Sequence, residues 1–333
     1  MKAMRLGAAG APLQLETLQL PPPGEHQIRI AVEACGVCRT DLHLLDGELP
    51  DIHYPLTPGH EIVGRVVARG AAATRWPVGA RVGVPWLGGT CGACRDCREG
   101  RENLCPSARF TGYSLDGGYA EQVLADERYC LSLPTAGAAA ELAPLLCAGL
   151  IGYRAYRAAG PSQRLGLYGF GAAAHLLAQV ARADGREVYA FTRADDAAGQ
   201  LFARQLGVAW AGGSDQAPPE PLDAAILFAP VGALVPAALA AVRPGGRVIC
   251  AGIHMSDIPR FPYRLLWGER EVRSVANLTR ADGEQFMRRA GQLGLRATVE
   301  CFPLHAANEA LGRLRAGTLQ GAAVLVAGGS GAS

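Results

Sequence analysis

The stretch RLGLYGFGAAAHLLAQVARADG, residues 164–185, decides the fold. Its first residues are an apolar run that predicts a β-strand, and its second half has the apolar spacing of a helix. Between the two, Gly169 and Gly171 form a G-x-G turn, so that Ala172 and Ala173 open the helix. A strand, a glycine turn and a helix in this order are typical of dinucleotide-binding units, in which the pyrophosphate lies at the helix N-terminus.

The same alternation of strand and helix patterns continues after this stretch. It can be followed at 186–193, 195–207, 221–230, 232–245 and 246–253. Strands that alternate with helices pair in parallel, so we expect an α/β fold with a doubly wound parallel sheet over residues 152–283.

The flanking regions follow a different pattern. Residues 1–151 contain short apolar runs rich in β-branched residues between Gly and Pro turns, which predicts a mostly β domain. The elements after residue 283, a helix, a strand, a helix and a last strand, are expected to return to this domain. The final residues, 327–333, are rich in glycine and are expected to form a flexible tail.

Composition narrows the class of partner. The chain has 333 residues, 49% of them hydrophobic, which is enough for about two domains. The net charge is only +2 and Lys2 is the sole lysine, so no basic stripe favours nucleic acid, and we expect a small-molecule partner. The N-terminus lacks the pattern of a secretory signal and no apolar run is long enough to span a membrane. We therefore expect a cytoplasmic protein with no membrane partner.

Four cysteines are clustered in CGACRDCREGRENLC, namely Cys91, Cys94, Cys97 and Cys105. In a reducing compartment, cysteines at such short spacing are more often metal ligands than disulfides. Four thiolates can converge on one Zn²⁺ at about 2.3 Å each, and a closed set of four leaves no position for water or substrate. We therefore expect a structural zinc; the alternatives are an iron–sulfur centre, whose compact motif has a different spacing, and reduced thiols.

A second candidate set is dispersed along the chain and comprises Cys38, His60 and Cys147. Two thiols and one imidazole with an open fourth position are the ligand set of a catalytic zinc that polarises an alcohol or carbonyl oxygen. Singly, each residue also fits an ordinary role, such as a buried thiol in an apolar helix or a hydrogen-bonded histidine. Spacing alone does not decide between these interpretations.

The segments around these residues resemble the zinc-containing medium-chain dehydrogenase/reductase family, the alcohol dehydrogenases. The resemblance covers nearly the whole chain, because GVCRTDLH, PGHEIVGRV, VGVPWLGGTCGACRDCREGRENLC, GGYAEQV, PLLCAGLIGYRA and YGFGAAAH all occur in the family's order and spacing. It implies a GroES-like catalytic domain over 1–151 and 284–333 with a structural-zinc lobe at about 88–108. Residues 152–283 would then be a Rossmann cofactor domain.

The resemblance also implies the site residues. Cys38, His60 and Cys147 match the catalytic zinc ligands, and Cys91, Cys94, Cys97 and Cys105 match the structural ones. Glu61 matches a carboxylate that can approach the metal, and Asp41 an acid that holds the zinc-bound imidazole. Thr40 matches the hydroxyl that bonds the substrate oxygen, His43 the outer base of a proton relay, and Arg39 a pyrophosphate contact.

Two further features concern the cofactor and the substrate. Thr192 and Arg193 end a strand where NAD enzymes carry an acid, so we expect NADP(H), with NAD(H) as the alternative because Arg193 could instead cover the adenine. Trp86 and Leu49 fall where the family lines its substrate channel, and a bulky indole there favours primary alcohols or slender aldehydes. The family commonly has an arginine near the last strand, whereas this chain has Ala322, and His254 has no assigned role.

The predicted function is a zinc-dependent alcohol dehydrogenase with two Zn per chain and a small alcohol or aldehyde as substrate. In the family, a segment like 271–279 pairs two subunits, so a homodimer or homotetramer is expected. One alternative is a zinc-free quinone or enone reductase of the same superfamily, which would lack both ligand sets. Another is a metal- or nucleotide-binding sensor without turnover, which the neutral charge and the dinucleotide turn do not favour.

Overall fold

The computed structural model describes residues 1–326 and divides the chain into two units. Unit 1 contains Met1–Cys147 and the chain from Asn277 onward, and unit 2 contains Ala148–Ala276. The boundaries expected from the sequence, 151/152 and 283/284, fall inside helices α4 (Ala148–Ala159) and α8 (Arg280–Leu293), whereas the units divide before each helix. The predicted flexible tail, 327–333, lies outside the described residues.

Unit 2 is built on a parallel sheet with the strand order β12-β11-β10-β13-β14-β15, in which every neighbouring pair is parallel. Its strands are β10 (Arg164–Tyr168), β11 (Glu187–Thr192), β12 (Trp210–Gly213), β13 (Leu222–Leu227), β14 (Val242–Cys250) and β15 (Glu271–Ser274). The sequence order reverses between β10 and β13, which is the switch point of a doubly wound sheet. The α/β fold class expected from the alternating pattern is confirmed.

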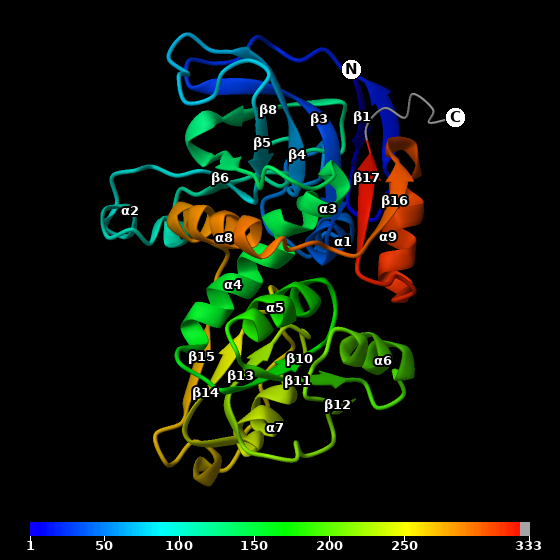
Figure 1. Ribbon diagram of the computed structural model, residues 1–333. Coiled ribbons are helices and arrows are strands. Elements are labelled where there is room, and N and C mark those ends of the chain that lie inside the picture. The colour runs from blue at the N-terminus through cyan, green and yellow to red at the C-terminus, as the bar shows by residue number, and fades with distance from the viewer. Residues whose placement is uncertain (327–333) are drawn as a thin grey trace. The chain divides into compact units, whose positions relative to one another are not determined.

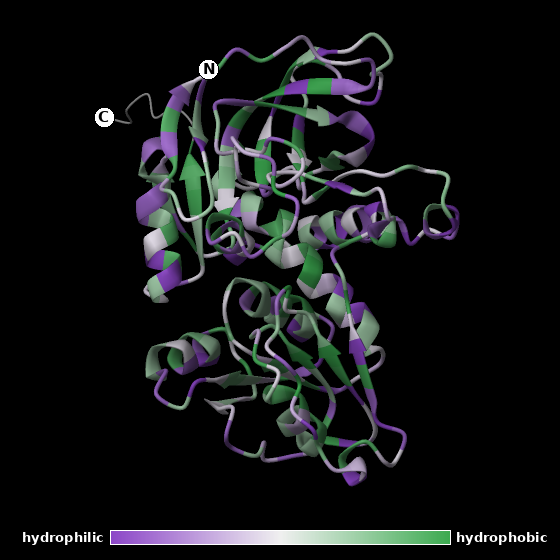
Figure 2. Ribbon diagram, turned by 180° about the vertical axis from the view of Figure 1, so that it is seen from behind, coloured by the Kyte–Doolittle hydropathy of each residue, from purple (hydrophilic) through white to green (hydrophobic). Residues whose placement is uncertain are grey.

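Helices connect these strands and cover the sheet, as Figure 1 shows for α4, α5 (Ala172–Ala183), α6 (Ala197–Gln205) and α7 (Leu234–Ala241). The central strands are apolar on both faces, since Leu165, Leu167 and Ile226 are buried on one face and Tyr168 and Leu227 on the other. Figure 2 shows this as hydrophobic colour along the strands of the sheet. Continuous apolar strands of this kind are expected where helices lie on both faces.

Two details of unit 2 differ from the sequence-based expectation. The helix expected over 232–245 ends at Ala241, and β14 begins at the next residue, because Pro244 and the glycines after it cannot continue a helix. Strand β12 was not predicted, since its sequence WAGG has two glycines and no β-branched residue. It pairs with β11 at the edge of the sheet, so tertiary pairing overrides its weak propensity.

Unit 1 is mostly β, as predicted. Strand β3 (Gln27–Val37) is its longest and pairs with three others, β4 (Ile62–Arg69), β8 (Gln122–Asp126) and β17 (Ala322–Val326). The sheet continues through β5 (Arg81–Val84) and β9 (Leu131–Ser132) on one side and β16 (Val299–Pro303) on the other. The chain after Asn277 therefore returns to the N-terminal sheet through β16 and β17.

Short elements complete unit 1. They are β1 (Lys2–Arg5), β2 (Gln14–Thr17), α1 (Arg39–Leu45), β6 (Leu87–Gly89), α2 (Arg95–Arg98), η1 (Glu102–Leu104), β7 (Arg109–Phe110), η2 (Glu127–Tyr129), α3 (Ala139–Leu142), η3 (Ala143–Leu146), η5 (Leu304–Ala306) and α9 (Ala307–Ala316). In unit 2, η4 (Tyr263–Leu265) precedes β15. Within residues 1–326, every helix is too short or too polar to cross a bilayer.

The glycine turn that decides the fold has two glycines with different constraints. Gly169 has a φ of +86°, and a Cβ there would lie 2.8 Å from the Ala229 nitrogen and 2.9 Å from its Cβ. Gly171 has a φ of −108°, and its Cβ position has no protein atom within 4 Å. The fold therefore requires glycine at 169, whereas it tolerates a side chain at 171.

Gly169→Ala should destabilise the protein by about 1–3 kcal/mol, because the left-handed φ and the Ala229 contact both oppose a Cβ. Gly171→Ala is the matched control and should change the free energy of unfolding by less than about 0.5 kcal/mol. Urea unfolding of the ligand-free protein measures both variants. Equal effects of the two substitutions would contradict this account of the turn.

Candidate active site

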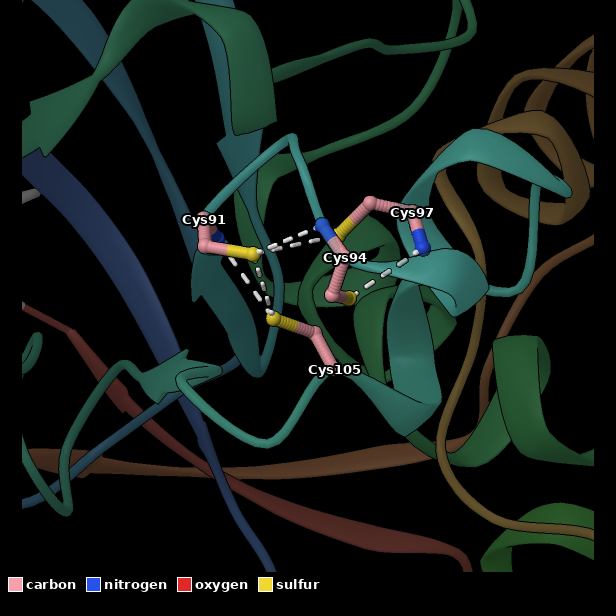
Figure 3. Close-up of side chains that lie close together, drawn as sticks. All are labelled: Cys91, Cys94, Cys97 and Cys105. Carbon is pink, nitrogen blue, oxygen red and sulfur yellow. Dashed lines mark hydrogen bonds between the residues drawn. The ribbon is translucent and has the colours of Figure 1, made fainter.

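The four clustered cysteines come together at one point, where their sulfur atoms face one another (Figure 3). All four sulfurs lie within 4.8 Å of one another, with Cys91 Sγ 3.5 Å from Cys105 Sγ and 3.9 Å from Cys97 Sγ. A tetrahedron with Zn–S bonds of about 2.3 Å has S···S edges of about 3.8 Å. The spacing of these sulfurs therefore fits a single tetrahedral metal ion.

Backbone donors in the same loop favour the thiolate form of Cys91. The N–H of Cys94 donates to Cys91 Sγ at 3.3 Å, and the N–H of Cys97 donates to Cys94 Sγ at 3.5 Å. The N–H groups of Ala93 and Cys94 lower the pKa of Cys91 to about 6. A thiolate is the form of cysteine that binds a metal ion.

The loop that carries these cysteines has little apolar core, since no residue of α2 is buried. It is attached to the rest of unit 1 by the buried carboxylate of Glu102, whose Oε1 accepts from the Arg280 backbone N–H at 3.0 Å and from its Nε at 3.2 Å. At the start of the loop, the Thr90 and Tyr129 hydroxyls share a hydrogen bond of 2.7 Å. Because apolar burial is slight, a bound metal ion would contribute much of the loop's stability.

The dispersed set is also brought together. Cys38 precedes α1, His60 and Glu61 precede β4, and Cys147 lies between η3 and α4, where its φ of −132° and ψ of −70° interrupt the helical path. The Sγ atoms of Cys38 and Cys147 are 3.7 Å apart. One ligand atom from each of these residues, with an oxygen of Glu61, lies within 4.8 Å of all the others.

The polar atoms at this site fit a metal ion better than they fit one another. His60 is 1% exposed, and its Nε2 has no hydrogen-bond partner among the described residues; the same holds for Glu61 Oε2. Leaving such an atom buried and unpaired costs about 1–3 kcal/mol. Burial also raises the pKa of the Glu61 carboxyl well above its usual value. A cation between these donors would satisfy the unpaired imidazole nitrogen and oppose the effect of burial on Glu61.

Asp41 lies behind His60 and is fully buried. Its Oδ1 is 3.5 Å from His60 Nδ1, while its Oδ2 accepts from the Cys38 N–H at 2.8 Å and from the Tyr119 hydroxyl at 3.0 Å. Burial, and then the charge of Asp41, raise the pKa of Tyr119 well above its usual value, so the hydroxyl remains a donor. A carboxylate at His60 Nδ1 favours the tautomer that leaves Nε2 free to bind a metal.

Helix α1 carries the other predicted residues of this region. Thr40 is 5% exposed, and its Oγ1 lies 3.7 Å from Cys38 Sγ, beside the candidate ligands. His43 is three residues further along the same helix face, and its Nδ1 contacts Glu48 Oε2. Arg39 opens the helix with an exposed side chain. The helix therefore presents Thr40 and His43 together on the face next to Cys38.

Aromatic side chains line one side of His60. The Trp86 ring meets the imidazole edge to face, with centroids 4.9 Å apart, and stacks on Phe110 at 5.1 Å and on Tyr113 at 5.8 Å. Phe110 and Tyr113 were not singled out from the sequence, although both flank the Thr111–Gly112 turn. Predicted channel residue Leu49 is half-buried, and its neighbour Pro50 accepts the Tyr113 hydroxyl through its carbonyl.

In unit 2, the glycine turn follows the carboxyl end of β10, at the point where the order of the strands in the sheet reverses. Gly171 caps α5, and Ala172 and Ala173 begin it, with Gly171 exposed and both alanines half-buried. The first N–H groups of a helix have no intrahelical acceptor and are available to an anion. The turn therefore has the geometry of a pyrophosphate site.

Thr192 and Arg193 at the end of β11 have separate roles in the structure. Thr192 is 4% exposed, and its hydroxyl donates to the Arg193 carbonyl at 2.9 Å and accepts from Gln200 Nε2 at 3.2 Å. The Arg193 side chain is 81% exposed and lies 3.8 Å from Asp195. The Thr192 hydroxyl is therefore used in hydrogen bonds within the local fold, whereas the Arg193 guanidinium is accessible to a ligand. Elsewhere, Ala322 is buried in β17 and His254 is exposed after β14.

Comparison with known proteins agrees with this architecture. Residues 24–135 match the model of the alcohol dehydrogenase GroES-like domain. The chain is 48% identical to a probable alcohol dehydrogenase of Mycobacterium tuberculosis over 95% of its own length and 93% of the relative's.

Solved structures extend the agreement to the whole fold. Cinnamyl alcohol dehydrogenase of Sorghum bicolor matches with a TM-score of 0.89 at 26% identity, over 98% of this chain and 97% of the other. Acetophenone reductase of Geotrichum candidum, solved in complex with NAD, matches with a TM-score of 0.87 at 27% identity, over 98% and 96%. The chain is therefore an enzyme of the alcohol dehydrogenase type and belongs to the medium-chain dehydrogenase/reductase family.

Proposed function

We propose that this enzyme is a zinc-dependent alcohol dehydrogenase that interconverts primary alcohols and aldehydes and prefers NADP(H). The observation that carries the proposal is the convergence of Cys38, His60 and Cys147, whose ligand atoms lie within 4.8 Å of one another and of a Glu61 oxygen. A zinc-free reductase of the same superfamily would not need these three side chains to converge. A sensor without turnover is disfavoured by the alcohol dehydrogenase relatives.

Cys38, His60 and Cys147 would hold the catalytic zinc, which when bound supplies a Lewis acid for the alcohol or carbonyl oxygen. The Thr40 hydroxyl, next to Cys38, would accept a hydrogen bond from the alcohol and, as it takes up the alcohol proton, release its own proton toward the outer base. His43 would pass that proton to solvent, with Glu48 holding its Nδ1. Cys91, Cys94, Cys97 and Cys105 would hold the second, structural zinc.

The nicotinamide cofactor would bind to unit 2 and supply or accept the hydride. Its pyrophosphate would lie against the Gly169–Gly171 turn and the N–H groups at the start of α5. Arg193 supports NADP(H), because it is a highly exposed cation at the end of β11, where NAD enzymes carry an acid. Because Thr192 uses its hydroxyl internally, we assign the 2′-phosphate to Arg193 alone.

The stacked rings of Trp86, Phe110 and Tyr113 support the substrate class. A flat aromatic wall beside His60 leaves room for a slender or planar group and opposes branching at the reacting carbon. The sorghum relative is named for cinnamyl alcohol, which is a primary alcohol with a planar aromatic group. We therefore propose primary alcohols as the substrates, with aromatic ones preferred.

We further propose a homodimer or homotetramer that pairs through β15. This strand is the edge of the parallel sheet, and all four of its residues are exposed. Large apolar side chains are also exposed nearby in the chain, namely Ile253, Ile258, Tyr263, Trp267 and Val272. An unprotected edge strand with exposed apolar neighbours is a site where a second copy can pair.

Cys147→Ala should leave a folded protein that retains about one zinc per chain and loses nearly all turnover, because an open set of three ligands has lost one. Cys97→Ala should also remove about one zinc but should mainly lower thermal stability. Metal content, melting temperature and aldehyde reduction are measured on the same samples. Full activity of the Cys147 variant would refute the catalytic assignment.

Arg193→Ala should raise the KM for NADPH about ten- to a hundredfold, since hydrogen bonds to charged groups contribute about 1.5–3 kcal/mol. The KM for NADH should hardly change. Steady-state kinetics with both cofactors and one aldehyde measures the two values. If the two cofactors are weakened by similar factors, Arg193 only covers the adenine and the NADP preference must be withdrawn.

Light scattering at working concentrations should give the mass of two or four chains. Val272→Lys, which places a charge on the exposed edge strand, should shift the mass toward one chain. Leu201→Lys, an equally apolar exposed position on α6, is the control and should not change the mass. A monomeric mass for the unmodified protein would exclude this assembly.

A further inference from the structure

Tyr119 is fully buried, although its side chain carries a polar hydroxyl. That hydroxyl donates to Asp41 Oδ2 at 3.0 Å, across 78 positions of sequence. Neither the family resemblance nor the local sequence pattern assigned it a role. A buried hydroxyl aimed at the carboxylate behind a candidate metal ligand is a feature that the proposed mechanism has not used.

The backbone around Tyr119 is tied to the segment that carries His60. The N–H groups of Gly117, Gly118 and Tyr119 donate to the carbonyls of Thr57, Gly59 and Pro58, at 2.7, 2.9 and 2.9 Å. The Tyr119 ring lies so close to Gly59 that a Cβ on that residue would be 2.4 Å from its Cδ1. Tyr119 therefore has a fixed position relative to His60, which is the residue after Gly59.

The hydroxyl links this segment to helix α1. Asp41 Oδ2 accepts both the Tyr119 hydroxyl and the Cys38 N–H, so that oxygen has two donors. Asp41 Oδ1 has no hydrogen-bond partner among the described residues and lies 3.5 Å from His60 Nδ1. The two donors on Oδ2 thus fix the carboxylate in the orientation that directs Oδ1 at the imidazole.

We propose that Tyr119 is a positioning residue of the Cys38–His60–Cys147 site, acting through Asp41 to hold the His60 ring and its tautomer for metal binding. The proposal rests on the zinc function proposed above. Partners outside the ligand set commonly tune metal affinity, because they preorganise the ligand and fix which nitrogen is free. Tyr119 extends this arrangement by one hydrogen bond and connects it to β8 through the Gly117–Tyr119 segment.

Tyr119→Phe tests the proposal, because it keeps the buried ring and removes only the hydroxyl. The control is Tyr156→Phe, which removes a similar hydrogen bond in unit 2, from the Tyr156 hydroxyl to Asp184 Oδ2 at 2.6 Å. Each protein is titrated with a metal chelator while zinc per chain is measured. The zinc step that is absent in Cys147→Ala identifies the site in question.

We expect Tyr119→Phe to weaken zinc binding in that step about tenfold, the lower end of the range for loss of an outer partner. Tyr156→Phe should change it less than about twofold, since its hydrogen bond goes to Asp184 and not to Asp41. After loading with Co²⁺, the visible d–d spectrum should change in Tyr119→Phe and in Asp41→Asn, but not in Tyr156→Phe.

Two outcomes separate failure of this inference from failure of the proposed function. If Tyr119→Phe folds with unchanged zinc affinity and an unchanged Co²⁺ spectrum, Tyr119 is only a core residue and the inference is wrong. If the unmodified protein itself shows no zinc step that Cys147→Ala removes, the proposed zinc function is wrong.

Discussion

The structure depends on a group of candidate metal-binding atoms, two of which are buried without a hydrogen-bond partner among the described residues. Cys38 and Cys147 are 109 positions apart in the chain, yet their sulfurs are 3.7 Å apart. Beside them, His60 Nε2 and Glu61 Oε2 are buried and have no hydrogen-bond partner within residues 1–326. Burying such atoms is unfavourable unless something binds them. The tight backbone around them, with glycine at 59 and the ring of Tyr119 against it, keeps these atoms from rearranging to satisfy one another. The site is therefore preorganised for a cation, at a cost in stability that a bound ion would offset.

The two cysteine-containing sites differ in the way that their proposed roles require. The four clustered cysteines lie in a loop with few buried residues, so the main effect of a metal there is on folding. The Cys38 set is carried by segments of unit 1 that adjoin α1, β4 and η3, so its geometry is fixed by the surrounding fold. As zinc ligands, these three residues would leave a position for a substrate, which a closed set of four thiolates would not.

Much of this could be predicted from the sequence, for reasons that differ between residues. The strand, turn and helix at 164–185 and the cysteine spacing at 91–105 are local patterns, and the chain geometry of a few residues determines them. Cys38, His60 and Cys147 converge only in the folded chain, so spacing could not pair them, and the family resemblance was needed.

Strand β12 was missed because its glycines give no strand signal, and its pairing with β11 is a tertiary effect. The contacts of Phe110, Tyr113 and Tyr119 depend on packing between distant segments, which no periodicity reveals. For Thr192, the residue type suggested a ligand contact, but its hydroxyl is used by the neighbouring backbone and Gln200.

The central claim is that Cys38, His60 and Cys147 hold a metal ion distinct from the one held by the clustered cysteines. Anomalous diffraction from crystals of the purified protein, recorded on both sides of the zinc absorption edge, tests it most directly. The account predicts two zinc peaks per chain, one among Cys91, Cys94, Cys97 and Cys105 and one among Cys38, His60 and Cys147. The account would be contradicted by a zinc peak at the clustered cysteines alone, if the side chains of Cys38, His60 and Cys147 are well ordered and no metal peak lies next to His60 Nε2.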